Sequence, residues 1–388
     1  MYRGRVGVFL IIIVTMVLGA CGDITKAALN SSEENVPSKQ TSLQMKEHRI
    51  EANEITLSAI GDMLIHRPVY KDAEVENGYN FSPMLEEVKP YLNNATITVA
   101  NQETMIGGEE LGLSTYPSFN SPYEVGDALK DVGVDVVTLA NNHTLDRGET
   151  AIQNAIEHWE TIDMMYSGAY KNEQDKDRLR VYETEEGISI AFLSYTYGTN
   201  GIPVPEGKGY LVNLIDQKSI ESEIEQVKEQ ADVIILSLHF GNENERFPND
   251  TQKDLVQFAA DQGVDVVIGH HPHVLQPMEW VTGENGNQTF VAYSLGNFLS
   301  NQQDFYQRIG GVLTFSITKT VSGEDQNIEV HSPKFMPTYV NFQSGWVDYE
   351  VIPMYKLTNN DLAGAEEHYK EIKNHMSQWM PDLEFVEE

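Results

Sequence analysis

The sequence is short of cysteine and of basic residues. A single cysteine, Cys21, occurs among the 388 residues, so the chain forms no internal disulfide and its fold depends on its core. Lysine and arginine number 26 against 59 aspartate and glutamate residues, which gives a net charge of −33. A general nucleic-acid-binding protein needs a surplus of basic residues to replace counterions, so nucleic acid is excluded as a partner. The acidity also argues against docking on anionic lipid through a basic patch.

The acidity restricts the ligand as well. A polyanionic ligand would be repelled unless a local positive charge, such as a bound metal ion, reverses the field. In the alternative interpretation, the charge only keeps the surface soluble. The hydrophobic content of 40% is typical of a globular chain, and the length allows one large domain or two smaller ones.

Long apolar runs are also missing. A membrane-spanning helix needs about 20 apolar residues, and the longest predominantly apolar run covers only residues 6–20. Arg3 and Arg5 precede this run and Cys21 follows it directly, which resembles a signal peptide that ends in a bacterial lipobox. We therefore predict a lipoprotein signal peptide over residues 1–21, with Cys21 lipidated and the chain anchored to the extracytoplasmic face of the cell membrane. The alternative is an uncleaved signal anchor with an incidental cysteine.

Composition divides the rest of the chain into three parts. Residues 22–50 are polar and lack periodicity, which predicts a flexible tether. Residues 51–355 hold the predicted strands and helices of one folded domain. Residues 356–388 carry apolar residues near helical spacing and are predicted to form a C-terminal helical extension.

One pattern recurs through the folded part: a short aliphatic run ends abruptly in polar residues. The runs have the length of strands buried on both faces, and helix-like stretches lie between them. This alternation predicts an α/β domain, in which ligands bind beyond the carboxyl ends of the strands. The predicted strands cover residues 55–60, 95–100, 134–140, 233–238, 264–268 and 289–294.

The polar residues after these strands are rich in metal-ligating types. Each cluster alone is weak, because a single histidine at a strand end is often only a core residue. Together they combine imidazole, carboxylate and amide oxygen, a set that suits Zn, Mn or Fe, and their number suffices for two adjacent divalent ions. Six of the 11 histidines lie in these clusters with one aspartate, one glutamate and one asparagine: His66, His143, His239, His270, His271, His273, Asp62, Glu103 and Asn142.

The order of these clusters resembles the CapA/PgsA family of poly-γ-glutamate capsule biosynthesis proteins. The resemblance covers residues 55–300, and its most specific block is the Gly-His-His-Pro-His-Val-Leu-Gln run that begins at Gly269. That family is similar to calcineurin-like metallophosphoesterases. The resemblance therefore implies that residues 51–355 form a four-layer αββα sandwich with a dinuclear metal site.

The resemblance also implies roles for individual residues. Asp62 and His273 would bind the first metal ion, and Glu103 would bridge the two ions. The second ion would be bound by Asn142, His239 and His271.

His143 would be the catalytic acid, and Asp62 would share the catalytic role. The sequence departs from the phosphoesterase pattern at Glu103, where that superfamily has aspartate, and at Asn141, where it has glycine. It also places His66 four residues after Asp62 instead of two.

Six further residues have less specific roles. His66, His270 and Glu243 are predicted either to bind metal or to contact a metal-binding side chain and orient it without touching the metal. Tyr195, Asn200 and Asn297 are predicted to contact substrate, with simple packing or turn formation as the alternative.

Three functions remain open from the sequence. The resemblance implies a membrane-anchored protein that acts with a membrane synthase complex in poly-γ-glutamate synthesis or export. A second hypothesis is a metal-dependent hydrolase of phosphoester or amide bonds. A third is a non-catalytic scaffold whose metal site binds poly-γ-glutamate or another anionic polymer.

Overall fold

The computed structural model describes residues 50–323 and 325–387. The described residues form one compact unit. The predicted signal peptide, the lipobox Cys21 and the tether up to residue 49 lie outside the described residues. No helix among the described residues has the length and apolar character needed to cross a bilayer.

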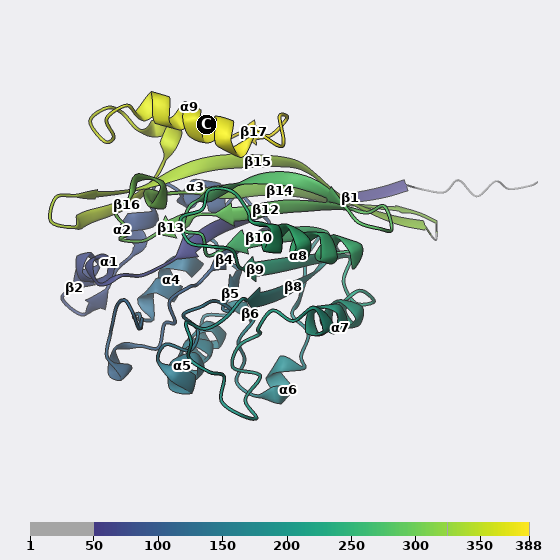
Figure 1. Cartoon of the computed structure of the whole chain (residues 1–388), viewed down its shortest axis with the longest axis horizontal. Helices are drawn as coiled ribbons and strands as arrows, with labels where there is room; N and C mark the ends of the chain where they lie inside the picture. The colour runs from purple at the N-terminus through teal and green to yellow at the C-terminus, as the bar shows by residue number, and fades with distance from the viewer. Residues whose placement is uncertain (1–49, 324, 388) are drawn as a thin grey trace, which may run out of the picture. The chain divides into compact units, whose positions relative to one another are not determined.

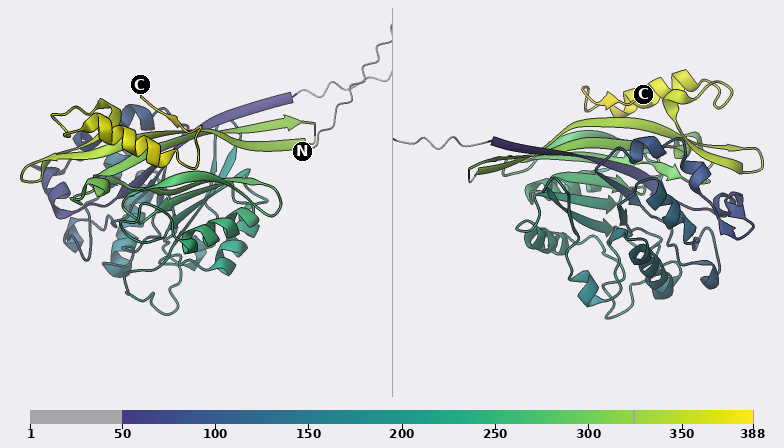
Figure 2. Two further views of the ribbon diagram at one scale, coloured as in Figure 1. Left: turned by 45° about the horizontal axis from the view of Figure 1, so that its top comes forward. Right: turned by 180° about the vertical axis from the view of Figure 1, so that it is seen from behind.

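The larger sheet has nine strands and mixes parallel with antiparallel pairing (Figure 1). Its parallel part joins β1 (Ile50–Met63), β4 (Ile97–Asn101), β5 (Val136–Thr138) and β6 (Met165–Ser167). On its other side β1 pairs antiparallel with β14, and β15 and β16 follow in order. These strands and two short additions are β14 (Ile309–Ser322), β15 (Asp325–Gln343), β16 (Val347–Pro353), β13 (Asn297–Leu299) and β17 (Glu384–Phe385). Figure 2 shows β1, β14 and β15 running side by side toward the N-terminal end.

The second sheet has six strands in the order β11-β12-β10-β9-β8-β7. Its four central strands are parallel, and an antiparallel strand closes each edge. The strands are β7 (Val181–Glu183), β8 (Ser189–Thr196), β9 (Val233–His239), β10 (Val266–His270), β11 (Leu275–Thr282) and β12 (Gln288–Leu295). A separate two-stranded ribbon pairs β2 (Glu74–Val75) with β3 (Gly78–Tyr79).

The two sheets pack face to face, with helices on their outer faces. The core between them takes alternate side chains of both sheets, for example Leu57 of β1 and Ile235 of β9. A second core joins the larger sheet to α4 (Glu124–Asp131) and α5 (Gly148–Thr161). A third joins the smaller sheet to α7 (Gln217–Val227) and α8 (Asp250–Asp261). The predicted four-layer α/β sandwich is confirmed.

The remaining helices are short, apart from the one near the C-terminus. Helix α9 (Ala365–Met376) lies over β15 in Figure 1 and buries Ile372 and Met376 in the core between the sheets. The division predicted at residue 355 stays a prediction. The other helical segments are α1 (Arg67–Asp72), α2 (Ser82–Leu85), α3 (Lys89–Leu92), α6 (Glu173–Lys176), η1 (Glu109–Leu111), η2 (Phe305–Arg308) and η3 (Met354–Lys356).

Close strand packing sets the position of the histidines after β10. Gly269 lies against β12, where an added Cβ atom would stand only 1.9 Å from the carbonyl oxygen of Tyr293. Any side chain here would push the two strands apart. The glycine therefore holds the end of β10, and His270 with it, close to its neighbour.

Candidate metal centre

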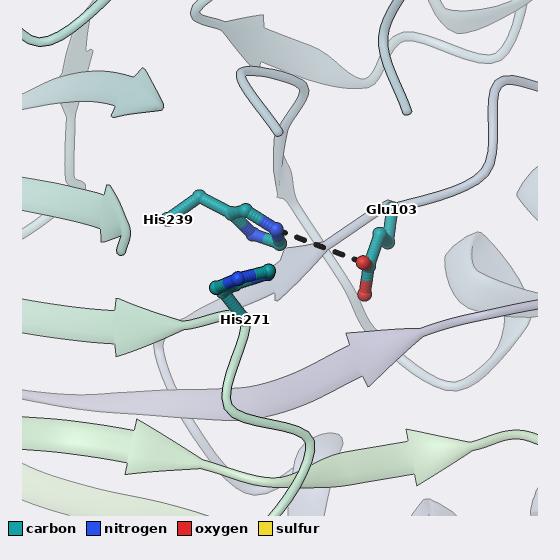
Figure 3. Close-up of side chains that lie close together, drawn as sticks. All are labelled: Glu103, His239 and His271. Atoms are coloured by element: carbon teal, nitrogen blue, oxygen red, sulfur yellow. Dashed lines mark ion pairs between the residues drawn. The ribbon is translucent and has the colours of Figure 1, made fainter. Parts of the chain in front are cut away.

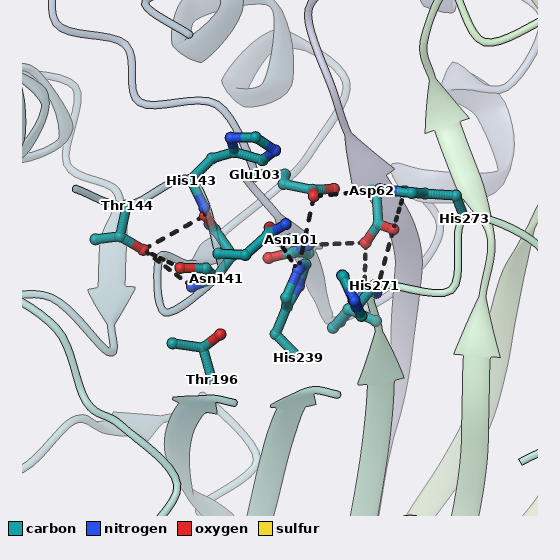
Figure 4. A network of polar contacts seen from close by, with 12 residues as sticks. Asp62, Asn101, Glu103, Asn141, His143, Thr144, Thr196, His239, His271 and His273 are labelled. Atoms are coloured by element: carbon teal, nitrogen blue, oxygen red, sulfur yellow. Dashed lines mark hydrogen bonds and ion pairs between the residues drawn. The ribbon is translucent and has the colours of Figure 1, made fainter. Parts of the chain in front are cut away.

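The polar residues that follow the parallel strands lie together at one edge of the two sheets (Figure 4). Asp62 lies near the end of β1, Glu103 follows β4, and His239 ends β9. His271 and His273 lie in the turn after β10. Parallel strands bring their carboxyl ends to one edge, so residues far apart in the sequence meet there.

Glu103 joins one group of potential ligands. Its buried Oε1 atom lies 3.6 Å from Nε2 of His239 and 3.7 Å from Nε2 of His273. Figure 3 shows its carboxylate directed toward His239 and His271, and one ligand atom of each of these three residues lies within 4.8 Å of the others. Neither oxygen of Glu103 has a hydrogen-bond partner among the described residues. A buried carboxylate in this state needs a cation to offset its lost hydration.

Asp62 joins a second group with Glu103 and His273. Its Oδ1 atom accepts a hydrogen bond from Asn101 Nδ2 at 2.8 Å and lies 3.1 Å from Nδ1 of His270. Its Oδ2 atom lies 3.3 Å from Nδ1 of His273. These contacts hold a fully buried carboxylate in one orientation.

The side chain of Asn142 faces the same space. Its Oδ1 atom lies 2.9 Å from Nε2 of His239, and its Nδ2 atom donates to Oδ1 of Asn200 at 3.3 Å. The amide oxygen therefore points toward the histidine that approaches Glu103.

His143 is held by a carboxylate on its own loop. Its Nδ1 atom lies 2.7 Å from Oδ2 of Asp146, and the same oxygen accepts a hydrogen bond from the backbone N–H of Phe119 at 2.7 Å. The Phe119 ring packs edge-on against His143 with the ring centroids 4.7 Å apart. One ring nitrogen of His143 is thus occupied and its plane is fixed.

The turn after β10 has an unusual backbone. His271 and His273 adopt φ angles of 97° and 58°, a region that residues with a side chain rarely enter. Each such residue costs of order 1–3 kcal/mol. Strain of this kind persists where the surrounding structure demands it, and here it directs two imidazoles to the same space.

Comparison with known proteins places the chain in a family. Residues 56–302 match the sequence model of the family described as bacterial capsule synthesis protein PGA_cap. This match covers most of the chain. The chain belongs to the PGA_cap family.

Two relatives of this PGA_cap chain are similar to it over most of its length. A capsule biosynthesis protein CapA of Bacillus anthracis is 30% identical over 263 residues, which are 66% of this chain and 62% of the relative. A PGA biosynthesis protein CapA of Bacillus subtilis is 26% identical over 294 residues, 71% of this chain and 72% of the relative. Among solved structures, a Staphylococcus aureus protein described as a candidate 5′-nucleotidase, in complex with α-ketoglutarate, is 13% identical with a TM-score of 0.42. That match covers 82% of this chain and 58% of the other.

The donor set of the PGA_cap chain fits divalent metal ions. Besides the two oxygens of Glu103, three buried imidazole nitrogens have no hydrogen-bond partner among the described residues. They belong to His239 (Nδ1), His270 (Nε2) and His271 (Nδ1). Buried polar atoms are nearly always paired, so a concentration of unpaired ones marks a place for a ligand. Imidazole and carboxylate donors suit Zn, Mn or Fe.

The pKa values of the histidines favour metal binding. Burial lowers the pKa of His239 well below its usual range, and burial together with the neighbouring His273 lowers the pKa of His271 to about 3. Both imidazoles are therefore neutral at physiological pH, the form that binds metal.

The carboxyl groups of Asp62 and Glu103 and the imidazole of His273 influence one another's pKa values. Burial alone would raise the pKa of Asp62, but the hydrogen bonds with His270 and His273 hold it well below its usual range. Burial raises the pKa of Glu103 well above its usual range, against the opposing charge of His273. Burial would lower the pKa of His273, yet Glu103 and Asp62 raise it to about 9. Without a metal ion, Asp62 is thus ionised beside a protonated His273, and Glu103 favours its neutral form, whose proton a bound cation would displace.

His66, His270 and Glu243, each predicted either to bind metal or to orient a ligand, lie at different positions around this centre. His270 contacts Asp62 and is buried. His66 contacts its neighbour's carbonyl, Leu64 O, at 3.0 Å and packs edge-on against Phe119, outside the ligand groups. Glu243 is exposed on the loop after β9, and its carboxylate groups with His271 and His273 within 4.8 Å.

The structure brings two of the three predicted substrate residues to the centre. Asn200 contacts Asn142 and lies 3.4 Å from Nδ1 of His143. Asn297 is buried, with Oδ1 3.1 Å from Nδ1 of His273, so it supports that imidazole from behind.

Tyr195 lies elsewhere. Its side chain is buried under α7, where the hydroxyl donates to Glu223, and both residues line a separate cavity of about 630 Å³. The structure does not bring Tyr195 to the ligand groups, because its position in β8 directs the side chain to the helical face of the sheet.

Two residues of the centre are not evident from the sequence. Asn101 fixes Asp62, and Asp146 fixes His143. Asp146 also accepts the backbone N–H of Phe119, which ties the loop before α5 to the segment around Phe119. The spacing of three residues between His143 and Asp146 is the one signal that the sequence offered for this pair.

Proposed function

We propose that the chain binds two divalent metal ions, with Mn, Zn or Fe as the candidates. Six residues would hold them: Asp62, Glu103, Asn142, His239, His271 and His273. The support is the set of buried oxygens and nitrogens without hydrogen-bond partners among the described residues, together with groups of Asp, Glu and His ligand atoms that lie within 4.8 Å of one another. When bound, such ions supply Lewis acidity, which polarises a substrate oxygen and lowers the pKa of a water ligand.

The surrounding residues would orient these ligands. Asn101 and His270 hold Asp62, and Asn297 holds His273. Partners of this kind fix the direction of a ligand and its protonation state.

We further propose that the chain is a membrane-anchored, extracytoplasmic CapA-type protein that acts in poly-γ-glutamate synthesis or export with a membrane synthase complex. The family match over residues 56–302 carries this proposal. The names of the two Bacillus relatives and the lipobox-like sequence before Cys21 support it. A metal centre would give this acidic chain a local positive region where polymer carboxylates can bind.

A deletion strain tests this role. Loss of the gene should abolish surface poly-γ-glutamate, and the wild-type gene should restore it. His239→Ala should fail to restore the polymer, while the exposed control Glu225→Gln should succeed. Cys21→Ser should release the protein from the membrane fraction. Normal polymer in the deletion strain would defeat the proposed role.

A second candidate function is metal-dependent hydrolysis of a phosphoester or amide bond. The oriented His143–Asp146 pair favours it, because an imidazole fixed at one nitrogen can give a proton to a leaving group from the other. The purified chain should bind metal by elemental analysis and cleave a panel of phosphodiester and γ-glutamyl amide substrates. His143→Asn should lower kcat. Tight metal binding without any turnover would favour the non-catalytic scaffold.

A further inference from the structure

Tyr197 is the first residue after β8 and turns toward the metal centre. Its side chain is 50% exposed, whereas that of Tyr195, two residues earlier, is 3% exposed. The backbone N–H of Tyr197 donates to the carbonyl oxygen of His239 at 3.0 Å, which ties this residue to the end of β9.

The ring of Tyr197 lies against two of the proposed metal ligands. Its centroid is 4.6 Å from that of His271 and 6.5 Å from that of His239, and the second pair of rings is nearly parallel at 8°. Its hydroxyl interacts with the side chain of Asn142. One exposed residue therefore contacts three of the six proposed ligands.

This placement differs from core packing. Tyr197 belongs to none of the three hydrophobic clusters and leaves half of its side chain open to solvent. The phenolic hydroxyl of Tyr197 can donate a hydrogen bond. Three residues farther along the same loop, Asn200 reaches His143 and Asn142. The loop thus lines one side of the space between the ligands and His143.

We propose that Tyr197 contacts the substrate at the metal centre, with its hydroxyl donating a hydrogen bond to a negatively charged substrate oxygen. The inference rests on the proposed metal centre and adds to it a residue that binds the ligand without binding the metal. The oxygen belongs either to a phosphoryl group or to a carboxylate of a γ-glutamyl chain, since both accept such a bond.

Binding measurements on the full-length chain test this role. Calorimetry first gives the Mn²⁺ affinity, and then the affinity of the Mn²⁺-loaded protein for inorganic phosphate and for a γ-glutamyl oligomer. A hydrogen bond to a charged group changes affinity about 10-fold or more. Tyr197→Phe should keep Mn²⁺ binding within about threefold and weaken one of the two anions about 10-fold or more. The weakened anion identifies the oxygen. Tyr182→Phe, on β7 at the amino end of β8, is the matched control and should leave both unchanged.

The outcomes separate this inference from the metal centre itself. A wild-type chain that binds no Mn²⁺ would defeat the metal centre. Two results would overturn the role of Tyr197 while leaving the metal centre intact. In the first, the protein binds Mn²⁺ and Tyr197→Phe binds both anions with unchanged affinity. In the second, the wild type binds Mn²⁺ but neither anion. If Tyr197→Phe binds both anions like the wild type while Tyr197→Ala does not, the ring only packs on His271. This result too would overturn the role of the hydroxyl.

Discussion

Glu103 is the residue whose surroundings most clearly call for a bound cation. Its carboxylate is buried, lies near Asp62, and has no hydrogen-bond partner among the described residues. The sequence predicted it as a ligand candidate from its place among the metal-ligating residues at the strand ends, and the resemblance implied that it bridges the two ions. The structure adds a physical reason, because His239 and His273 stand at distances that leave room for an ion between the groups.

Metal binding should therefore stabilise the fold through Glu103. A ligand at about 1,000 times its Kd adds about 4 kcal/mol to the free energy of unfolding, so Mn²⁺ should raise the Tm of the metal-free chain by several degrees. Glu103→Gln should lose most of this shift, because an amide binds divalent ions more weakly than a carboxylate. Scanning calorimetry with and without chelator measures it. Glu225→Gln, on the exposed face of α7, should behave as wild type, and an equal Mn²⁺ shift in Glu103→Gln would contradict the assignment.

Asp146 gives a prediction about His143. Asp146→Asn keeps an oxygen for the Phe119 N–H but removes the charge that faces Nδ1 of His143. If the chain hydrolyses a model phosphodiester, kcat should fall about 10-fold to 100-fold, which is part of the roughly 10²–10⁴-fold that general acid catalysis contributes. KM should change little, since the substrate is held elsewhere. A pH–rate profile that stays the same in shape and height would contradict the pairing.

At the scale of single elements, a half-buried acid, Asp265, directly precedes β10. Asp265 accepts a hydrogen bond from the backbone N–H of Ile234 at 2.8 Å, which joins β10 to β9. Burial raises the pKa of Asp265 to about 6 from a usual 3.8. As the pH rises from 4 to 6, this carboxyl ionises in the unfolded chain but keeps its proton in the folded one. The folded state therefore loses stability over this window.

Asp265→Asn should remove this pH dependence. As the pH rises from 4 to 7, the unfolding free energy of the variant should increase by about 1–2 kcal/mol relative to that of the wild type. This value is smaller than the full pKa shift implies, because the side chain is partly exposed to solvent. Urea unfolding at both pH values measures the difference. Asp254→Asn, on the exposed face of α8, controls for the loss of one negative charge, and a constant difference for Asp265→Asn would contradict the argument.

Helix α8 begins with a capping box after the loop that carries Glu243. The Asn249 side chain accepts from the backbone N–H of Gln252, and the Gln252 side chain accepts in return from the backbone N–H of Asn249. Asn249→Ala should lower the free energy of unfolding by about 0.5–2 kcal/mol. The exposed Thr251→Ala in the same turn should have little effect. Equal stability of the two variants would show that the cap is dispensable.

Elements also show where sequence reasoning reached its limit. The run at residues 134–140 predicted a strand, but β5 covers only Val136–Thr138, because the residues after it turn to place Asn142 and His143. Two tyrosines lie at the end of β8, Tyr195 within the strand and Tyr197 directly after it, and the sequence favoured Tyr195. Side chains two residues apart in a strand share a face, so Tyr197 faces the metal centre only because β8 ends at Thr196. The spacing of residues in the sequence does not show where β8 ends.

At the scale of the whole molecule, the charge sets a further expectation. A net charge of −33 opposes the compact state through self-repulsion, and this repulsion is screened by salt. With chelator present, an increase of NaCl from 20 to about 200 mM should raise the Tm, because the electrostatic screening length falls below about 10 Å over this range. The increase should shrink near pH 5, where carboxylates begin to take up protons. A Tm that is independent of salt at pH 7 would contradict it.

The sequence by itself determined the α/β alternation, the strand-end positions of the ligand candidates and the family. Apolar runs and the residues that follow them are local features, so they can be read without coordinates. The tertiary structure decided which side chains share one space: Glu103 with His239 and His273, Asp62 with Asn101, His143 with Asp146, and Tyr197 in place of Tyr195. These contacts join residues up to about 170 positions apart, as for Glu103 and His273, and depend on sheet register and on where each strand ends. Both are set by packing of the whole domain and not by any local pattern.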